Sequence, residues 1–212
     1  MTCPHCQGAE NLFDKNFAER DLRDYRRNGP GKTARLLIEA LKAFGIQDAT
    51  LLDIGGGVGV IQHELLKDGA SSATHVDASS AYLQAARQEA QRQGHADRIT
   101  YLHGDFVDLA PQIQQADVVT LEKVICCYPD VRALVGLSSA RAGKLYGVVF
   151  PRDTWWMKIG GRMVNFFFWI QRSAFRFFVH PTEAVDALVR QNGLERRYYR
   201  QTILWQVIVY AR

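Results

Sequence analysis

Hydrophobic positions along the chain fall into two patterns, short apolar runs and longer amphipathic stretches. Short runs rich in branched residues are typical of buried strands, and apolar residues spaced three and four apart are typical of helices. We predict strands at residues 50–54, 73–77, 98–103, 117–122 and 144–150, and one or two final strands within 198–210. We predict helices at residues 12–27, 33–44, 60–67 and 79–93.

This order of elements defines the fold class. Strands that alternate with helices imply an α/β protein, a three-layer sandwich whose mostly parallel sheet carries helices on both faces. Ligands of such folds bind outside the carboxyl ends of the strands. The candidate chemistry should therefore lie where the predicted strands end.

The first predicted strand runs into a glycine turn, Asp53-Ile54-Gly55-Gly56-Gly57-Val58-Gly59, and then into a helix. Such a turn presents backbone N–H groups to a bound small molecule. The dinucleotide pattern Gly-x-Gly-x-x-Gly fails because Val60 stands at its third glycine position. Asp53 would repel a phosphate but suits a ligand with an ammonium group, such as S-adenosylmethionine (SAM).

Residues 53–59 resemble motif I of the class I SAM-dependent methyltransferases. The resemblance implies a Rossmann-like, mostly parallel seven-stranded sheet with an antiparallel last strand. Asp77 ends a strand about 20 residues after Gly57, the spacing at which a carboxylate reaches ribose hydroxyls. Residues 102–106 resemble the family's adenine-edge segment. The resemblance assigns the cofactor to Asp53, Gly55, Gly57, Gly59, Asp77, Asp105, Phe106 and Glu122, with Asp105 at the adenine amine, Phe106 beside the ring and Glu122 near the sulfonium.

The region after the fourth predicted strand indicates the acceptor. Residues 124–130 and 174–181, together with 24–30, resemble the magnesium-protoporphyrin O-methyltransferases and their uncharacterised relatives. Cys127 departs from that group, many members of which have histidine there. The Asn/Asp-Pro-Pro-Tyr loop of enzymes that methylate bases or amides is missing. We therefore predict a small-molecule acceptor methylated at an oxygen, porphyrin-like or aromatic. The alternatives are a non-catalytic SAM-binding module and a methyltransferase acting on RNA or protein.

Whether a base is needed depends on the acceptor atom. An ionised carboxylate needs none, whereas a phenol or alcohol benefits from one, and the candidates are Tyr128, His180 and Tyr25. Each has a structural interpretation as well. Tyr128 before a proline can be a packed turn residue, His180 can end a helix before Pro181, and Tyr25 can be an aromatic on a helix surface.

An aromatic segment, residues 163–179, follows the fifth predicted strand. Asn165, Arg172 and Arg176 recur in it at helical spacing as a polar stripe. We expect a lid insertion near 152–181, with Arg172 or Arg176 gripping an anionic acceptor. Two other interpretations stay open, a core helix with a wide apolar face and a helix that rests on a membrane surface.

Composition sets the outer limits. A chain of 212 residues with 47% hydrophobic content fits one domain, which we divide into an N-terminal helical cap (1–45) and a SAM-binding domain (46–212). A net charge of +4 without a basic arm disfavours nucleic acid as a partner. Four cysteines suit a reducing, cytoplasmic setting.

Two further features exclude other classes. No apolar run reaches the roughly 18 residues of a membrane span, although peripheral contact stays open. Cys3, His5 and Cys6 are too few for a four-ligand zinc site. We therefore predict no metal and a frayed N-terminus.

Overall fold

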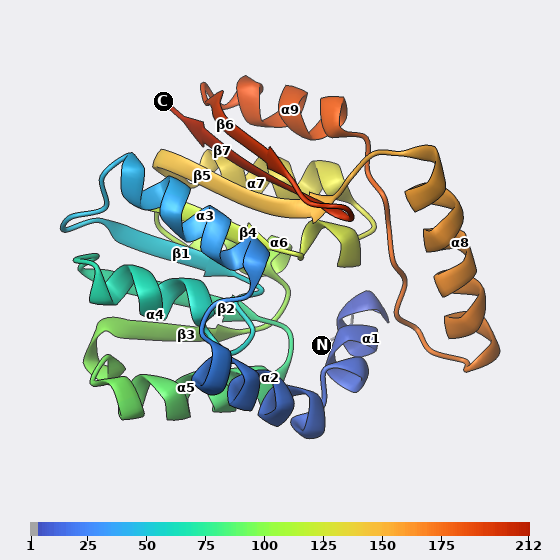
Figure 1. Ribbon diagram of the computed structural model, residues 1–212, viewed down its shortest axis with the longest axis horizontal. Coiled ribbons are helices and arrows are strands. Elements are labelled where there is room, and N and C mark those ends of the chain that lie inside the picture. The colour runs from blue at the N-terminus through green and yellow to red at the C-terminus, as the bar shows by residue number, and fades with distance from the viewer. Residues whose placement is uncertain (1–3) are drawn as a thin grey trace.

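The computed structural model describes residues 4–212, and the side chains from residue 7 onward. Within this part of the chain, seven strands form one sheet (Figure 1). In spatial order they are β3 (Ile99–His103), β2 (Ser72–Asp77), β1 (Thr50–Ile54), β4 (Ala116–Glu122), β5 (Ala142–Pro151), β7 (Trp205–Ala211) and β6 (Glu195–Gln201).

The strand directions confirm the predicted fold class. The pairs β1–β2, β2–β3, β1–β4 and β4–β5 are parallel, and β7 runs antiparallel to both of its neighbours, β5 and β6. Strand order reverses at β1, where the chain moves outward to β2 and β3 and later returns to β4. The crevice at this switch point is where open α/β sheets bind ligands.

Helices cover both faces of the sheet and complete the three layers (Figure 1). One face carries α3 (Lys32–Ala43), α4 (Val60–Lys67) and α5 (Ser80–Gln93). The other carries α6 (Phe106–Leu109), α7 (Val131–Ala140) and α9 (Thr182–Gln191). Three short 3-10 turns lie at Ala96–Arg98, Ala110–Gln112 and Ile125–Cys127.

Helix α3 falls within the range predicted for the cap, but it packs on the sheet. Leu37 and Leu41 are fully buried in the core cluster that α3 shares with β5 and β7. Gly147 on β5 makes room for this helix, because a Cβ there would lie 2.7 Å from a Leu37 methyl carbon. The part of the cap that stands off the sheet is therefore α1 and α2.

The N-terminal region differs from the predicted single helix at 12–27. It forms α1 (Pro4–Leu12) and α2 (Lys15–Asn28), separated at Asp14, whose carboxylate accepts a hydrogen bond of 2.9 Å from the Phe17 N–H and caps α2. Cys3 lies outside the described residues, and so do the side chains of His5 and Cys6. The structure therefore does not address the prediction made for them.

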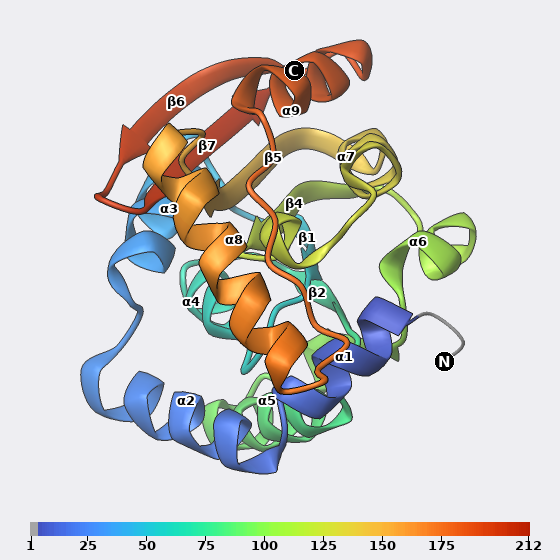
Figure 2. The ribbon, with the colours of Figure 1, turned by 90° about the vertical axis from the view of Figure 1, so that its right-hand side faces the viewer.

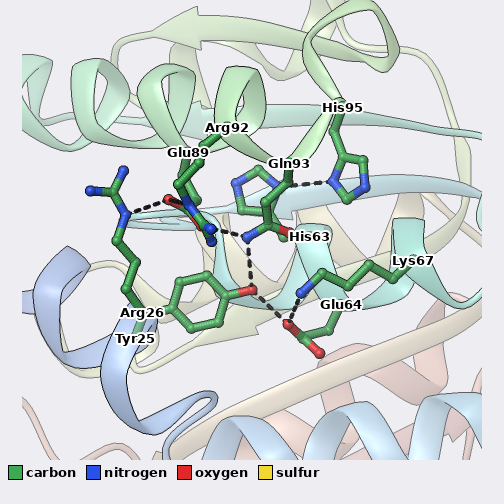
Figure 3. Close-up of polar contacts among 9 residues, drawn as sticks. All are labelled: Tyr25, Arg26, His63, Glu64, Lys67, Glu89, Arg92, Gln93 and His95. Carbon is green, nitrogen blue, oxygen red and sulfur yellow. Dashed lines mark hydrogen bonds and ion pairs between the residues drawn. The ribbon is translucent and has the colours of Figure 1, made fainter.

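Helix α2 is anchored to α4 and α5 by buried polar contacts (Figure 3). The Tyr25 hydroxyl donates to Glu64 on α4 at 2.6 Å, and the Arg26 guanidinium donates to Glu89 on α5 at 2.8 Å. Burial alone would raise the pKa of Glu89, but hydrogen bonds from Arg92, Gln93 and Arg26 outweigh it and lower that pKa to about 2. The carboxylate is thus ionised and fully partnered.

Helix α8 (Trp155–Ile170) stands apart from the sheet and is followed by an extended return segment, residues 171–180, that runs back along it (Figure 2). The predicted helical stripe through Arg172 and Arg176 is therefore wrong, because the helix ends before both. Arg172 has a left-handed backbone, φ 53°, that breaks the helical path. Phe166 and Phe167 are 56% and 58% exposed, so the core interpretation of this segment is also wrong.

None of the helices in residues 4–212 combines the length and the apolar character needed to cross a bilayer.

The packing of α3 gives a first testable prediction. Leu37→Ala removes a fully buried side chain at the helix–sheet contact and should lower the free energy of unfolding by about 2–5 kcal/mol. Glu39→Ala, on the exposed side of the same helix, should change it by no more than about 0.5 kcal/mol. Urea denaturation followed by circular dichroism measures both. Equal effects would show that α3 does not depend on this contact.

Candidate functional site

A cavity of about 580 Å³ opens at the carboxyl ends of β1, β2 and β4. The glycine turn forms its floor, α1 and α2 form one wall, and the return segment after α8 forms another. Among the described residues that line it, six are acidic and only Lys123 is basic. The acidic residues are Asp21, Asp24, Asp53, Asp77, Asp105 and Glu122. The cavity therefore favours a cationic ligand.

The glycine turn lies directly over buried side chains of β1 and β2. A Cβ on Gly56 would lie 2.5 Å from Asp53 Oδ2 and 2.8 Å from His75 Cε1, so only glycine fits there. Gly55 and Gly57 line the cavity and have positive φ of 61° and 56°. Gly59 does not line it and instead serves as the N-cap of α4. The turn thus exposes backbone to the cavity at residues 55–57.

Asp77 ties this turn to the end of β2. Its Oδ2 accepts from the Gly57 N–H at 3.0 Å, and its Oδ1 accepts from the Ser79 N–H at 2.8 Å. Burial raises its pKa to about 6, although the two backbone hydrogen bonds act in the opposite direction. Each carboxylate oxygen keeps a second acceptor site for a ligand hydroxyl.

Asp53 lies under the turn, with only 1% of its surface exposed. Oδ1 accepts from the Thr120 hydroxyl at 2.7 Å, whereas Oδ2 has no hydrogen-bond partner among the described residues. Burial raises the pKa of Asp53 to about 7, and the nearby carboxylates Glu122 and Asp77 add to the effect. When ionised, the Asp53 carboxylate can therefore attract a cation bound above the turn electrostatically, without touching it.

Asp105 and Tyr128 form a pair on the far side of the cavity. The Tyr128 hydroxyl donates to the Asp105 carboxylate, at 2.9 Å from Oδ2 and 3.1 Å from Oδ1. Asp105 also caps α6 by accepting from the Val107 N–H at 2.9 Å. Phe106 follows it, lines the cavity and is 4% exposed. The predicted adenine-edge residues therefore do lie together.

The end of β4 places Glu122 and Lys123 in the cavity wall. Glu122 accepts from the Thr33 hydroxyl at 2.7 Å and pairs with the Lys123 ammonium at 3.2 Å. Lys123 has a left-handed backbone, φ 61°, and its ammonium lies 5.6 Å from the centre of the Trp205 ring. Such strain in a residue without a glycine's freedom is concentrated at functional sites. The sequence analysis missed this lysine.

Two of the predicted bases have structural partners instead. Tyr25 lines the cavity, but its hydroxyl donates to Glu64, and burial, opposed by the hydrogen bond from Gln93, raises its pKa well above the usual range. His180 is not among the residues that line the cavity. Its Nε2 hydrogen-bonds the Tyr128 carbonyl at 2.9 Å, and burial lowers its pKa. These contacts favour structural roles for both side chains.

Aromatic side chains line both of these walls and the margin formed by β7. Phe13 and Phe17 come from the α1–α2 region, Phe175 and Phe177 from the return segment, and Trp205 from β7. Phe13 packs edge-on against Phe175 with ring centres 5.8 Å apart, which joins the two walls. Phe13, Phe17 and Trp205 were missed from sequence. Arg172 and Arg176, predicted to grip an anion, do not line the cavity; Arg176 donates to the Ser173 and Phe175 carbonyls.

No group of three His, Cys, Asp or Glu side chains in the described part of the chain is arranged to hold a metal ion.

Comparison with known families bears directly on the glycine turn. Residues 51–140, which run from β1 to α7, match the family model described as a methyltransferase domain. These residues form a methyltransferase domain. SAM is the methyl donor of this class, and the predicted cofactor is thereby confirmed.

The methyltransferase domain is similar to curated proteins that are longer than this chain. The ribosomal protein L11 methyltransferase of Enterobacter sp. (strain 638) is 32% identical over 127 residues, which are 55% of this chain and 42% of that protein. The chain spans about half the length of the curated relatives it matches.

Solved structures with the same fold cover nearly the whole chain. The magnesium protoporphyrin IX methyltransferase of Synechocystis PCC 6803, with bound S-adenosylhomocysteine, has a TM-score of 0.74 at 18% identity and covers 96% of this chain and 98% of that one. An O-methyltransferase family protein from Burkholderia thailandensis has a TM-score of 0.73 at 16% identity, covering 97% of this chain and 61% of that one. At these identities the likeness concerns the fold.

The raised pKa values of Asp53 and Asp77 make cofactor binding pH-dependent. Without ligand the folded protein retains protons that the unfolded chain releases near 3.8, so its free energy of unfolding falls as pH rises from 3.8 to about 7. A cationic ligand favours the ionised carboxyls, so SAM affinity should rise over the same range, by up to about tenfold per pH unit for each of the two carboxyls.

Calorimetry in two buffers of different ionisation enthalpy measures the protons released on binding. We expect net release near pH 6.5, between the two pKa values of about 6 and about 7, and a smaller release in Asp53→Asn. Proton release that is absent, or unchanged in the variant, would contradict the role given to Asp53.

Asp77 offers a direct test of the cofactor site. Asp77→Ala removes the acceptor of the Gly57 N–H and the carboxylate predicted to hold the ribose, and should weaken SAM binding roughly tenfold or more. Asp97→Ala, an exposed residue between α5 and β3, is the matched control and should bind as the unaltered protein does. Titration calorimetry reports both affinities, and equal values in the two variants would refute the assignment.

Proposed function

We propose that this protein transfers the methyl group of SAM to a small-molecule acceptor at an oxygen, and that the acceptor is a carboxylate on an aromatic or porphyrin-like skeleton. The observation that carries the proposal is one cavity lined by two unlike sets of side chains. Asp53, Asp77 and Asp105 lie around the glycine turn, and aromatic rings come from α2, the return segment and β7. The carboxylates suit a cationic nucleoside, and the rings suit a flat apolar acceptor.

The three candidate bases are already hydrogen-bonded to other protein groups, which favours a carboxylate acceptor over a hydroxyl acceptor. Tyr128 donates to Asp105, Tyr25 donates to Glu64, and His180 bonds a backbone carbonyl. None of these groups is arranged to take a proton from an acceptor. A carboxylate is already ionised and needs only to be held at near-attack distance from the methyl group.

Lys123 is the side chain we propose to hold that carboxylate. It is the only basic residue among the described residues that line the cavity, and it stands between Glu122 and the Trp205 ring. We therefore propose Asp53, Asp77, Asp105, Phe106 and Glu122 with the glycine turn as the cofactor site, and Tyr128 as a residue that positions Asp105.

Three other functions compete with this proposal. A protein acceptor is suggested by the named relatives, which methylate ribosomal protein L11, although the chain covers only about half of their length. RNA is disfavoured because its phosphates are held by several basic side chains, and Lys123 is the only basic residue among the described residues that line the cavity. A non-catalytic SAM-binding module would bind the cofactor without turnover. The proposal also keeps the predicted cytoplasmic setting; neither Cys126 nor Cys127 is in a disulfide.

Transfer of a tritiated methyl group to a panel of acceptors decides among these functions. The panel holds porphyrin carboxylates, other aromatic carboxylates, phenols, ribosomal protein L11 and RNA. We expect S-adenosylhomocysteine to form, with label in a base-labile ester of a carboxylate. Label in L11 or RNA would establish a rival, and binding without any transfer across the panel would favour the non-catalytic module.

Lys123→Met tests the acceptor contact. It keeps the length of the side chain and removes the charge, so kcat/KM for a carboxylate acceptor should fall roughly tenfold. SAM affinity should change by a smaller factor, through the lost ion pair with Glu122. Lys144→Met is the control for loss of a surface charge, because Lys144 is an exposed lysine at the start of β5, away from the cavity. An unchanged kcat/KM in Lys123→Met would remove this lysine from the acceptor site.

A further inference from the structure

The outer surface of α8 is the largest gathering of exposed apolar side chains in the described structure. Eight large hydrophobic residues on this helix are 42–74% exposed: Trp155, Ile159, Met163, Val164, Phe166, Phe167, Trp169 and Ile170. We call them the α8 apolar face. Among the described residues only four other large hydrophobic side chains are exposed, and apolar surface of this extent marks an interaction site.

Two of those four extend the α8 apolar face at its start. Ile203 and Leu204, at the tip of the β6–β7 hairpin, are 79% and 46% exposed. The Leu204 carbonyl accepts from the Arg152 N–H at 3.0 Å, which places the tip beside the beginning of α8. Figure 2 shows the hairpin tip next to this end of the helix. The surface therefore runs from the hairpin along the whole of α8.

The opposite side of α8 is already packed on the return segment. The Asn165 side chain donates to the Phe177 carbonyl at 2.8 Å and accepts from its N–H at 2.7 Å. The Phe168 and Phe175 rings meet edge to face at 5.2 Å. Phe175 and Phe177 line the cavity. The return segment thus covers the cavity, and the apolar face of α8 points away from it.

Charge identifies the partner of this face. From residue 154 to 182 the chain contains no Asp or Glu, but it contains Arg162, Arg172 and Arg176, and Lys158, which pairs with Asp153 at 2.6 Å. A second copy of the same helix would bring like charges together at the interface, which is unfavourable. An aromatic, basic, acid-free helix that is too short to span a bilayer is suited to the headgroup region of an anionic membrane.

We propose that the α8 apolar face and the β6–β7 hairpin tip dock this protein on the surface of an anionic lipid bilayer. Tryptophans near the two ends of the helix, Trp155 and Trp169, suit the interface between headgroups and acyl chains. Docking does not depend on methyl transfer. If the proposed function holds, the contact also places the cavity wall next to the phase in which a flat apolar acceptor dissolves.

Vesicle flotation tests the docking without any activity measurement. The protein is mixed with vesicles of phosphatidylcholine alone or of equal parts phosphatidylcholine and phosphatidylglycerol, and centrifuged through a density gradient. We expect flotation with the phosphatidylglycerol vesicles, reduced by high salt. We expect the double variant Phe166→Asp, Phe167→Asp to lower the lipid-bound fraction roughly tenfold or more.

Phe44→Asp is the matched control, because Phe44 is 43% exposed at the end of α3 and lies outside the docking surface. It should float as the unaltered protein does, and all three proteins should bind S-adenosylhomocysteine equally, which shows that they are folded. A protein that stays at the bottom with anionic vesicles overturns the proposal. So does flotation that survives the double variant, or light scattering that shows a dimer dispersed by it.

Discussion

The hydrogen bond from the Gly57 N–H to the Asp77 carboxylate links the two strands on which the site depends. β1 and β2 are parallel neighbours, so their carboxyl ends meet at one edge of the sheet. The bond fixes the glycine turn of β1 against the acidic end of β2. Gly56 can lie over Asp53 and His75 only because it has no side chain. This arrangement determines where the glycine turn lies, which carboxylates surround it and what shape the cavity floor has.

The sheet and the glycine turn could be predicted because local rules and tertiary packing agree there. Strands β1, β4 and β5 are short, largely buried runs rich in apolar residues, so hydrophobicity marks them, whereas β6 is charged and exposed. The N-terminal break was within reach as well, since Asp14 is a typical N-cap residue. The packing of α3 on the sheet could not be predicted, because only the complete sheet shows which of its faces receives Leu37.

The region after β5 shows where sequence periodicity misleads. Residues 163–179 are aromatic throughout, so the pattern cannot tell an amphipathic helix from an extended segment. The helix ends at Ile170, Arg172 turns the chain, and Phe175 and Phe177 then reach the cavity from an extended backbone. Lys123 was missed for a related reason, since its entry into the cavity depends on a positive φ that no local sequence rule requires.

The roles of Tyr25 and His180 depend on partners distant in sequence. Tyr25 bonds Glu64, 39 residues away, and His180 bonds the Tyr128 carbonyl, 52 residues away. Residue type alone allows each of them to be a base. The cofactor residues were more predictable because Asp53, Asp77 and Asp105 lie at or just beyond the carboxyl ends of strands that the parallel sheet must bring together.

The buried Glu89 restricts how molecules enter and leave the cavity. Its carboxylate is shared between Arg26 on α2 and two side chains of its own helix, Arg92 and Gln93. Swinging α2 outward would separate an ion pair whose acidic partner is fully buried, at considerable cost in free energy. The pair therefore holds the α2 wall of the cavity in place, so the entry and exit of molecules depend on the other walls.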